Sequence, residues 1–281
     1  MLEINAPAKI NLTLEVLSTR PDGYHDIRSV IQPVNLCDKF TFEESRDVSV
    51  ICDMPAWSVE KSLVKRAIDL MWAASDNSRG VSIKLEKNIP LMSGLGGDSS
   101  DAAAVLDGLN DFWELDLPPE KILDMASQLG SDVYFFLGGG IALVEGRGEI
   151  VSMLPPIPKM WVVLVMPEVP AEAGKTAAMY SRLKPAHFTD GSITQALVDI
   201  IIDGRNIDSS LFFNSFESIA FEENDLRRDY LDTIIKMGAS SVHLCGSGPA
   251  LYTAFDSQPV AEKFYTNCKQ LGMEVCITET L

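Results

Sequence analysis

The sequence predicts an α+β protein in which strands and helices follow one another in no regular order. Two kinds of segment support this fold class. Several short runs either alternate apolar and polar residues or are apolar throughout at strand length, and several longer segments repeat apolar residues at helical spacing. The absence of a regular βαβ alternation argues against a doubly wound parallel sheet.

The predicted strands are short segments spread along the whole chain. They lie at residues 10–17, 48–52, 81–85, 141–144, 161–166, 250–255 and 273–278. None of the apolar runs approaches the ~20 residues that a membrane-spanning helix needs. The sequence therefore predicts a protein without a membrane partner.

The predicted helices are amphipathic, and three of them carry start or stop signals. Segments 60–75 and 100–113 show the helical spacing, and in the first of them Leu63, Ala67 and Leu70 share one face. The other three segments are bounded by typical residues: 120–129 by Pro119 and Gly130, 224–237 by Asn224 and Gly238, and 259–271 by a following Gly272.

The length and charge of the chain narrow the choice of partners. It has 281 residues and a formal net charge of −17, so neither nucleic acid nor an anionic membrane is expected as the main partner. A phosphate site would need its own local hydrogen-bond donors and positive charges.

The proline-rich segment Leu154-Pro-Pro-Ile-Pro158 is the best candidate for a domain boundary. It predicts an N-terminal domain over 1–153 and a C-terminal domain over 154–281. Two lobes of one unit are the alternative.

The cysteine and histidine patterns predict no metal site built from these residues. Five cysteines form no CxxC pair, and three histidines complete no zinc-type spacing. The odd number of cysteines and the lack of a signal-peptide pattern indicate a reducing, cytoplasmic location. We expect a monomer or a weak homodimer.

The most informative segment is glycine-rich and lies between the strand at 81–85 and a helix that we expect to open near Ser100. Its sequence is PLMSGLGGDSSDAAA, residues 90–104. Glycines let backbone N–H groups surround an anion, and Ser99, Ser100 and Asp101 are expected to supply N-cap chemistry. Asp98 follows Gly97 where a Walker A loop has lysine, and a dinucleotide fingerprint would need a third glycine at position 99. A tightly packed strand-to-helix loop is the alternative.

This segment resembles the signature loop of the GHMP kinase superfamily. Three further segments resemble one branch, the 4-diphosphocytidyl-2-C-methyl-D-erythritol kinases: APAKINLTL at 6–14, RPDGYHDIR at 20–28 and GSDVYFFLGG at 130–139. A fourth, CGSGP at 245–249, is similar to the superfamily's C-terminal glycine motif. The resemblance implies a two-domain fold, each domain a mostly antiparallel or mixed sheet against helices, with the active site in the cleft between them.

The resemblance also implies the cofactors and the residues that bind them. ATP is the expected phosphoryl donor, and Ser99 or Ser100 is expected to help hold Mg²⁺. The residues that would surround the ATP phosphates are Pro90, Leu91, Met92, Ser93, Gly94, Leu95, Gly96, Gly97, Asp98, Ser99 and Ser100. Because a carboxylate near phosphate is unfavourable, we expect Asp98 to point away from the phosphates or to approach them only through Mg²⁺. Asp98 is one departure from the family's sequence pattern, and Tyr134, which stands where many relatives have proline, is a second.

The catalytic pair implied by the resemblance is Asp132 and Lys9. Asp132 would be the base, and Lys9 would keep it ionised and hold the acceptor hydroxyl. Taken from the residues alone, Asp132 is more simply a helix N-cap and Lys9 an exposed strand lysine. Asn11 would lie on the same strand face as Lys9.

The implied substrate carries cytidine diphosphate linked to methylerythritol. Its cytosine is expected at Tyr24 and His25, with Tyr180 as the second stacking face, although Tyr180 could also be a core residue. The expected contacts from the C-terminal part are Gly246, Ser247 and Gly248, which otherwise read as a tight turn. Mevalonate or homoserine as acceptor, a nucleotide-binding regulator without activity and a structural module are the rival functions.

Overall fold

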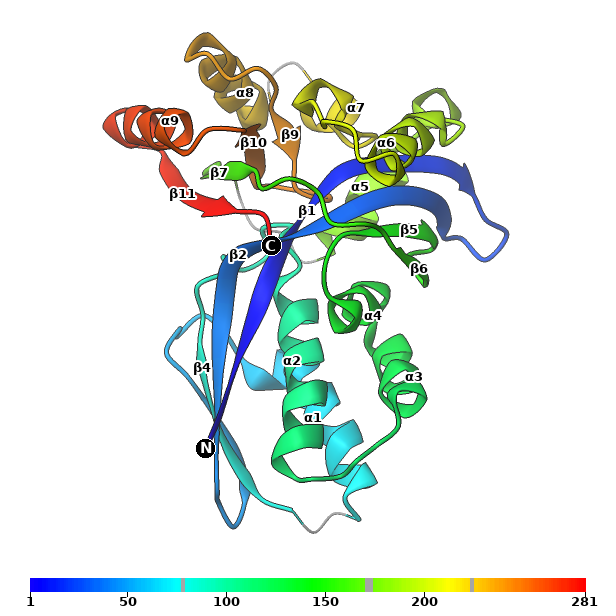
Figure 1. Cartoon of the computed structure of the whole chain (residues 1–281), viewed down its shortest axis with the longest axis vertical. Helices are drawn as coiled ribbons and strands as arrows, with labels where there is room; N and C mark the ends of the chain where they lie inside the picture. Colours follow the sequence, from blue (N-terminus) through cyan, green and yellow to red (C-terminus); the bar gives the residue numbers. More distant parts are fainter. Residues whose placement is uncertain (77–78, 170–173, 223–224) are drawn as a thin grey trace. The chain divides into compact units, whose positions relative to one another are not determined.

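The computed structural model describes residues 1–76, 79–169, 174–222 and 225–281 (Figure 1). Its helices and sheets confirm the predicted α+β class. The chain forms two compact units that interleave along the sequence. Unit 1 contains Met1–Ala8, Leu36–Leu91 and Gly96–Gly139, and unit 2 contains Lys9–Asn35, Met92–Leu95 and Gly140–Leu281. The boundary at residues 153 and 154 stays a prediction about which segments fold independently.

Unit 1 is a sheet covered by helices. Strand β3 (Val48–Cys52) pairs in parallel with β4 (Val81–Glu86), which pairs antiparallel with the end of β2 (His25–Glu43). A 3₁₀ turn, η1 (Val59–Lys61), leads into α1 (Leu63–Ala74). The remaining helices are α2 (Gly97–Phe112), α3 (Pro119–Leu129) and α4 (Ser131–Gly138). Phe40, Phe42, Ile83 and Leu85 of the strands join buried residues of the helices in one apolar core.

Unit 2 contains a four-stranded antiparallel sheet in the order β11-β7-β10-β9. These strands are β11 (Glu274–Glu279), β7 (Trp161–Met166), β10 (Leu251–Phe255) and β9 (His243–Leu244), and α9 (Gln258–Gln270) packs on them. Separately, β5 (Ala142–Gly146) pairs with β2 and with β6 (Ile150–Met153), while β8 (Phe213–Asn214) pairs in parallel with β1 (Leu2–Thr19). The other helices are α5 (Lys175–Arg182), α6 (Ser192–Ile202), α7 (Glu217–Ala220) and α8 (Leu226–Lys236), with 3₁₀ turns η2 (Pro185–His187) and η3 (Ser209–Leu211).

Most predicted elements are confirmed, and the misses are informative. Strands β3 and β7 have the predicted bounds, whereas β2, with 19 residues, was not predicted. Helices α5 to α7 were also missed, and α4 was expected only in the alternative that Asp132 caps a helix. The predicted cap Asn224 lies outside the described residues, and the observed N-cap of α8 is Asp225, whose carboxylate accepts from Arg227 N at 2.9 Å. Among the described helices, none combines the length and apolarity that crossing a membrane requires.

A buried ion cluster ties β2 to the segment between β4 and α2. Lys87 Nζ bonds to Asp38 and lies 2.7 Å from Asp101 Oδ2, and all three side chains are at most 2% exposed. Asp38 also accepts from the backbone N–H groups of Asn88 and Ile89 at 2.6 and 2.8 Å. Burial raises the pKa of Asp101 to about 8, although the Lys87 charge opposes this rise. A proton on Asp101 leaves the cluster with one cation against one carboxylate.

We predict that Lys87→Met destabilises the protein by about 3–5 kcal/mol, because it leaves the Asp38 carboxylate buried without its cation. Lys84→Met is the matched control, since Lys84 pairs with Glu43 at 2.9 Å on the surface with side chains 53% and 37% exposed. The control should cost no more than about 1 kcal/mol. Urea unfolding of both variants measures the difference, and equal losses would contradict a structural role for the cluster.

Candidate active site

In unit 1 the glycine-rich segment ends in the N-terminus of α2. This helix begins at Gly97 rather than near Ser100, and its N-cap is Gly96 with φ of +77° and no side-chain cap bond. The expectation that Ser99, Ser100 and Asp101 supply the N-cap is therefore wrong. Ser100 N donates to Gly96 O at 2.9 Å, so the first turn of the helix precedes it. The N–H groups of that turn have no acceptor within the helix, and such groups form an anion site.

Asp98 does not cap its own helix but serves α1. Both of its carboxylate oxygens accept from Leu63 N, at 3.1 and 3.2 Å. Ser62, the N-cap residue of α1, makes no side-chain cap bond and donates its hydroxyl to Val59 O instead. Asp98 thus supplies the acceptor that α1 otherwise lacks, and its charge is engaged at Leu63.

The two serines of the first turn of α2 differ in their surroundings. Ser100 is 1% exposed, and its Oγ has no hydrogen-bond partner in the described part of the chain. Ser99 is half-buried. Gly97 sits close to the end of β4, since a Cβ there would lie 3.0 Å from Ile89 Cγ2 and 3.5 Å from Lys87 Nζ. The hydroxyl of Ser100 is therefore an enclosed oxygen near the start of the helix that makes no hydrogen bond within the described part of the chain.

Asp132, also in unit 1, lies in the first turn of α4. The N-cap of this helix is Gly130, so the alternative that Asp132 is the N-cap is wrong. The side chain is half-buried. A helix N-terminus favours a nearby carboxylate by about 0.3–1 kcal/mol at exposed sites.

In unit 2, Lys9 begins a buried polar chain on β1. Lys9 is 5% exposed, and its Nζ donates to Asn11 Oδ1 at 2.7 Å, which confirms that the two side chains share one strand face. Asn11 Nδ2 donates to Ser29 Oγ at 2.9 Å, and Ser29 donates to Thr13 O. Among the residues of unit 2 that the structure describes, no carboxylate lies at ion-pair distance from Lys9. The alternative of an exposed strand lysine is therefore wrong.

Two glycine segments of unit 2 meet beside Lys9. A Cβ on Gly246 would lie 3.2 Å from both Lys9 Nζ and Gly94 O, and a Cβ on Gly94 would lie 2.1 Å from Cys245 O. Backbone hydrogen bonds hold the same contact: Lys9 N donates to Leu95 O at 2.9 Å, and Ala250 N donates to Ser93 O at 3.0 Å. Residues 93–95 therefore lie against both Lys9 and the turn at 246–248.

Two residues that the sequence did not single out position this turn. Asn214 Nδ2 donates to Leu244 O at 2.9 Å and to Gly246 O at 2.8 Å, and Thr176 Oγ1 lies 3.0 Å from Ser247 Oγ. The turn also connects β9 to β10, with Gly246 and Gly248 at φ of +55° and +79°. The interpretation of this segment as a tight turn that needs glycine is thus correct, and its contact with substrate stays a prediction.

The expected base-binding aromatics lie partly together in unit 2. The rings of His25 and Tyr180 stack with centroids 4.9 Å apart and 25° between planes, and Phe188 meets His25 edge-on at 6.0 Å. Tyr24 is 59% exposed, and the guanidinium of Arg147 lies 5.1 Å from its ring centroid. Phe188 and Arg147 were missed because nothing near them in the sequence links them to the segment at 24–25.

The structure thus assembles each half of the expected site separately. Unit 2 brings together Lys9, Asn11, residues 93–95 and the turn at 246–248, and unit 1 holds the α2 N-terminus and Asp132. Pairing of Lys9 with Asp132 stays a prediction. In the described part of the chain no three His, Cys, Asp or Glu side chains form a group that could hold a metal ion.

Comparison with known proteins identifies the family. The model of the GHMP kinases N terminal domain matches residues 62–140. A Dehalococcoides mccartyi protein named 4-diphosphocytidyl-2-C-methyl-D-erythritol kinase is 44% identical over 281 residues, which cover 100% of this chain and 99% of that protein. The chain belongs to the 4-diphosphocytidyl-2-C-methyl-D-erythritol kinase family. It is accordingly an ATP-dependent small-molecule kinase.

Two further members of the family match the chain, and a more distant solved structure shares its fold. A Listeria monocytogenes 4-diphosphocytidyl-2-C-methyl-D-erythritol kinase is 34% identical, over 98% of this chain and 94% of that protein. The crystal structure of a 4-(cytidine 5'-diphospho)-2C-methyl-D-erythritol kinase matches with a TM-score of 0.84 and 28% identity, covering 99% of both chains. Streptococcus pneumoniae phosphomevalonate kinase, with a TM-score of 0.72 and 15% identity over 100% of this chain and 99% of that one, shares the fold.

We predict that Gly94→Ala costs substantially more stability than Gly23→Ala. Both glycines have positive φ, of +91° and +83°, so each alanine carries a backbone cost of about 1–2 kcal/mol. Only at position 94 does the new Cβ meet backbone, at 2.1 Å from Cys245 O, which adds about 1–3 kcal/mol of overpacking. Urea unfolding measures both variants, and equal losses would show that the contact yields without strain.

Proposed function

We propose that this chain transfers the γ-phosphoryl group of ATP to the 2-hydroxyl of 4-diphosphocytidyl-2-C-methyl-D-erythritol, in the non-mevalonate (MEP) pathway to isoprenoid precursors. The observation that carries the proposal is the environment of Lys9 in unit 2. Its buried ammonium is held by the neutral amide of Asn11, beside residues 93–95 and the turn at 246–248. A buried cation with neutral partners attracts an anionic or polar ligand, because burial of a charge is costly until it is paired.

In the proposed reaction Asp132 is the base. It accepts the proton of the acceptor hydroxyl as the new O–P bond forms in line with the bond that breaks between the γ-phosphorus and the bridging oxygen, and ADP leaves. Lys9 holds the acceptor oxygen and keeps Asp132 ionised. The position of Asp132 in the half-buried first turn of α4 supports this role, since it holds the carboxylate on a fixed element.

The ATP phosphates are proposed to lie at the N-terminus of α2, within the segment 90–100. The uncapped helix start at Gly96 supports this, because its N–H groups are free to meet phosphate oxygens. Mg²⁺ fits the same place, since the buried, unpartnered Ser100 hydroxyl is the kind of oxygen ligand that this ion takes beside nucleotide phosphates. Ser100, or Ser99 next to it, would hold the ion, which would neutralise charge on the transferring group.

The cytosine is proposed to bind at Tyr24, His25 and Tyr180. The stacked pair of His25 and Tyr180 offers a flat surface and a polar ring edge, and Tyr24 is exposed to accept a second face. Gly246, Ser247 and Gly248 would contact the acceptor end. Homoserine or mevalonate has no base to stack, so the aromatic group favours the cytidine substrate over these rivals. The cytoplasmic location and the monomeric or weakly dimeric state stay predictions.

The proposal is tested by ADP release with Mg²⁺, ATP and 4-diphosphocytidyl-2-C-methyl-D-erythritol. We expect wild-type turnover of about 1–100 s⁻¹ and a loss of about 10²–10⁴-fold in Asp132→Asn, because the base is removed. Asp124→Asn, at an exposed aspartate of α3, is the matched control and should keep full activity. A folded wild type that turns over mevalonate or homoserine instead would overturn the substrate. Full activity in Asp132→Asn would overturn the base.

We further predict that Asp98→Gly changes the KM for ATP by only a few-fold, because the Asp98 carboxylate is engaged at Leu63 N. The same variant should lose about 1 kcal/mol of stability, since α1 loses its N-terminal acceptor. Steady-state kinetics and urea unfolding measure the two effects separately. A large rise in KM with unchanged stability would instead place Asp98 at the metal ion.

A further inference from the structure

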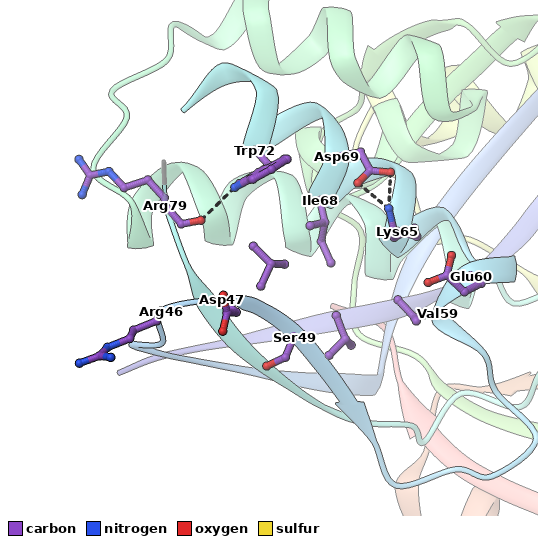
Figure 2. Close-up of a pocket in the computed structure, with 12 residues that line it drawn as sticks. Arg46, Asp47, Ser49, Val59, Glu60, Lys65, Ile68, Asp69, Trp72 and Arg79 are labelled. Carbon is purple, nitrogen blue, oxygen red and sulfur yellow. Dashed lines mark hydrogen bonds and ion pairs between the residues drawn. The ribbon is translucent and has the colours of Figure 1, made fainter. Parts of the chain in front are cut away.

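A cavity of about 400 Å³ in unit 1, between β3 and α1, shows no preference for one sign of charge (Figure 2). Three acidic and three basic side chains line it, and the guanidinium groups of Arg46 and Arg79 point away from it. The Asp69 carboxylate is already paired with Lys65, whose Nζ lies 2.6 Å from Oδ1. The buried cation Lys9 in unit 2 is a different case, because neutral side chains hold it in one hydrogen-bonded chain.

The hydroxyl of Ser29 fixes the direction of this hydrogen-bonded chain. Ser29 Oγ carries one proton, and it donates this proton to Thr13 O at 2.5 Å. Toward Asn11 the same oxygen can therefore only accept, and it accepts from Asn11 Nδ2 at 2.9 Å. With its amide nitrogen held at Ser29, Asn11 presents Oδ1 to Lys9 Nζ, which lies 2.7 Å away. Ser29 thus sets the orientation of the amide, and this orientation matches an ammonium group, which can only donate.

Burial makes this arrangement difficult to replace. Lys9, Asn11 and Ser29 are 5%, 3% and 0% exposed, so water has little access to a group that loses its partner. A reversed Asn11 amide would place its NH₂ group against the ammonium, where two donors would face one another. The backbone of Asn11 is held as well, since Asn11 O accepts from Tyr252 Oη at 2.7 Å. The amide therefore has one arrangement that satisfies both of its ends.

The carbonyl that accepts the Ser29 proton belongs to a cross-linked part of unit 2. Thr13 lies in β1, and its hydroxyl accepts from Val30 N of β2 at 3.0 Å and lies 3.0 Å from Thr194 Oγ1. Thr194 is in the first turn of α6, and its N–H donates to the buried Glu15 carboxylate at 2.6 Å. Strand β1 is thus joined to β2 and α6 around Thr13, so the acceptor of the Ser29 proton is held in place.

We propose that Ser29 is a positioning residue for the phosphoryl transfer: through Asn11 it directs the Lys9 ammonium toward the acceptor hydroxyl, a role that rests on the proposed function of Lys9. Ser29 contacts neither substrate nor ATP in this role and acts only through the amide that it orients. Such positioning matters because a shift of about 1 Å in a catalytic group can cost about 10²-fold in rate.

The first test compares Ser29→Ala with the wild type in the ADP-release assay. We expect kcat to fall about tenfold and the KM for ATP to stay within about twofold, because Lys9 loses its fixed direction while the nucleotide contacts do not change. Ser29→Thr keeps the hydroxyl and should restore kcat to within about threefold of the wild type. Ser29→Cys is similar in size to serine but is a weak acceptor, so it should behave like the alanine variant.

Thr253→Val is the matched control for loss of a buried hydroxyl. Thr253 lies in β10 and is 1% exposed, and its Oγ1 has no hydrogen-bond partner in the described part of the chain. The variant removes no hydrogen bond and should keep full activity. Urea unfolding checks that each variant is folded, and where Ser29→Ala does not fold, Ser29→Cys against Ser29→Thr gives the same comparison.

A double-variant cycle tests whether Ser29 acts through Asn11. In the Asn11→Ala background, Ser29→Ala should lower kcat by less than about twofold further, because the amide that Ser29 orients is already gone. The Asn11 side-chain amide signals in ¹H–¹⁵N NMR spectra, assigned with Asn11→Asp, should shift in Ser29→Ala and return in Ser29→Thr. This spectrum requires no turnover, so it reports the contact whatever the reaction is.

Failure of the Ser29 role and failure of the proposed reaction give different results. Equal activity of Ser29→Ala and a wild type that turns over the cytidine substrate would overturn the role of Ser29 and leave the reaction standing. Unmoved Asn11 signals in Ser29→Ala, or a full tenfold loss added to that of Asn11→Ala, would also contradict the role. A wild type that phosphorylates a different alcohol would overturn the cytidine substrate alone, and the kcat comparison is then made with that alcohol.

Discussion

The contact that organises unit 2 is the close backbone approach of the segment at 93–95 to the turn at 245–248. At Gly94 a single added carbon would lie 2.1 Å from a carbonyl oxygen, so the two segments meet at a distance that only glycine allows. Lys9 and Asn11 lie along this contact. The backbone N–H of Lys9 donates to Leu95 O, and Asn11 O accepts from Tyr252 Oη at 2.7 Å. The close approach at the glycines thus places the polar side chains of Lys9 and Asn11 beside the turn.

In unit 1, ion pairs rather than glycine contacts hold the segment that leads into the helix. This segment, between β4 and α2, provides no side-chain cap for the α2 N-terminus, so other side chains fix its position. Lys87, Asp38 and Asp101 supply this support inside the core, and Asp98 joins the same helix to the start of α1. These contacts involve none of the backbone N–H groups of the first turn of α2.

The local sequence pattern predicted those strands and helices that depend only on residues close together in the sequence. Strands β3 and β7 are short apolar or alternating runs, and α3 and α9 carry proline or glycine at their ends, so periodicity and caps were enough. Strand β2 was missed because buried polar residues such as Gln32 and Asp38 interrupt its pattern, and their partners are far away in sequence: Gln32 bonds to Leu281 O, and Asp38 to Lys87. The site motifs were found from resemblance, whereas Asn214 and Arg147 carry no local signal.

The two buried lysines show why residue identity alone does not identify a binding charge. Lys9 lies within β1 and Lys87 directly follows β4, and both are almost fully inaccessible. Lys87 lies between two carboxylates, so its charge is consumed within the fold and can support only structure. Lys9 is held by an amide that bonds to a hydroxyl, and neither neutralises it within unit 2. Since an unpaired buried cation is costly, a ligand that brings negative charge to Lys9 would relieve this cost. Placement of an ammonium among neutral partners, beside glycines that admit a close approach, is therefore the stronger evidence for a site in this chain.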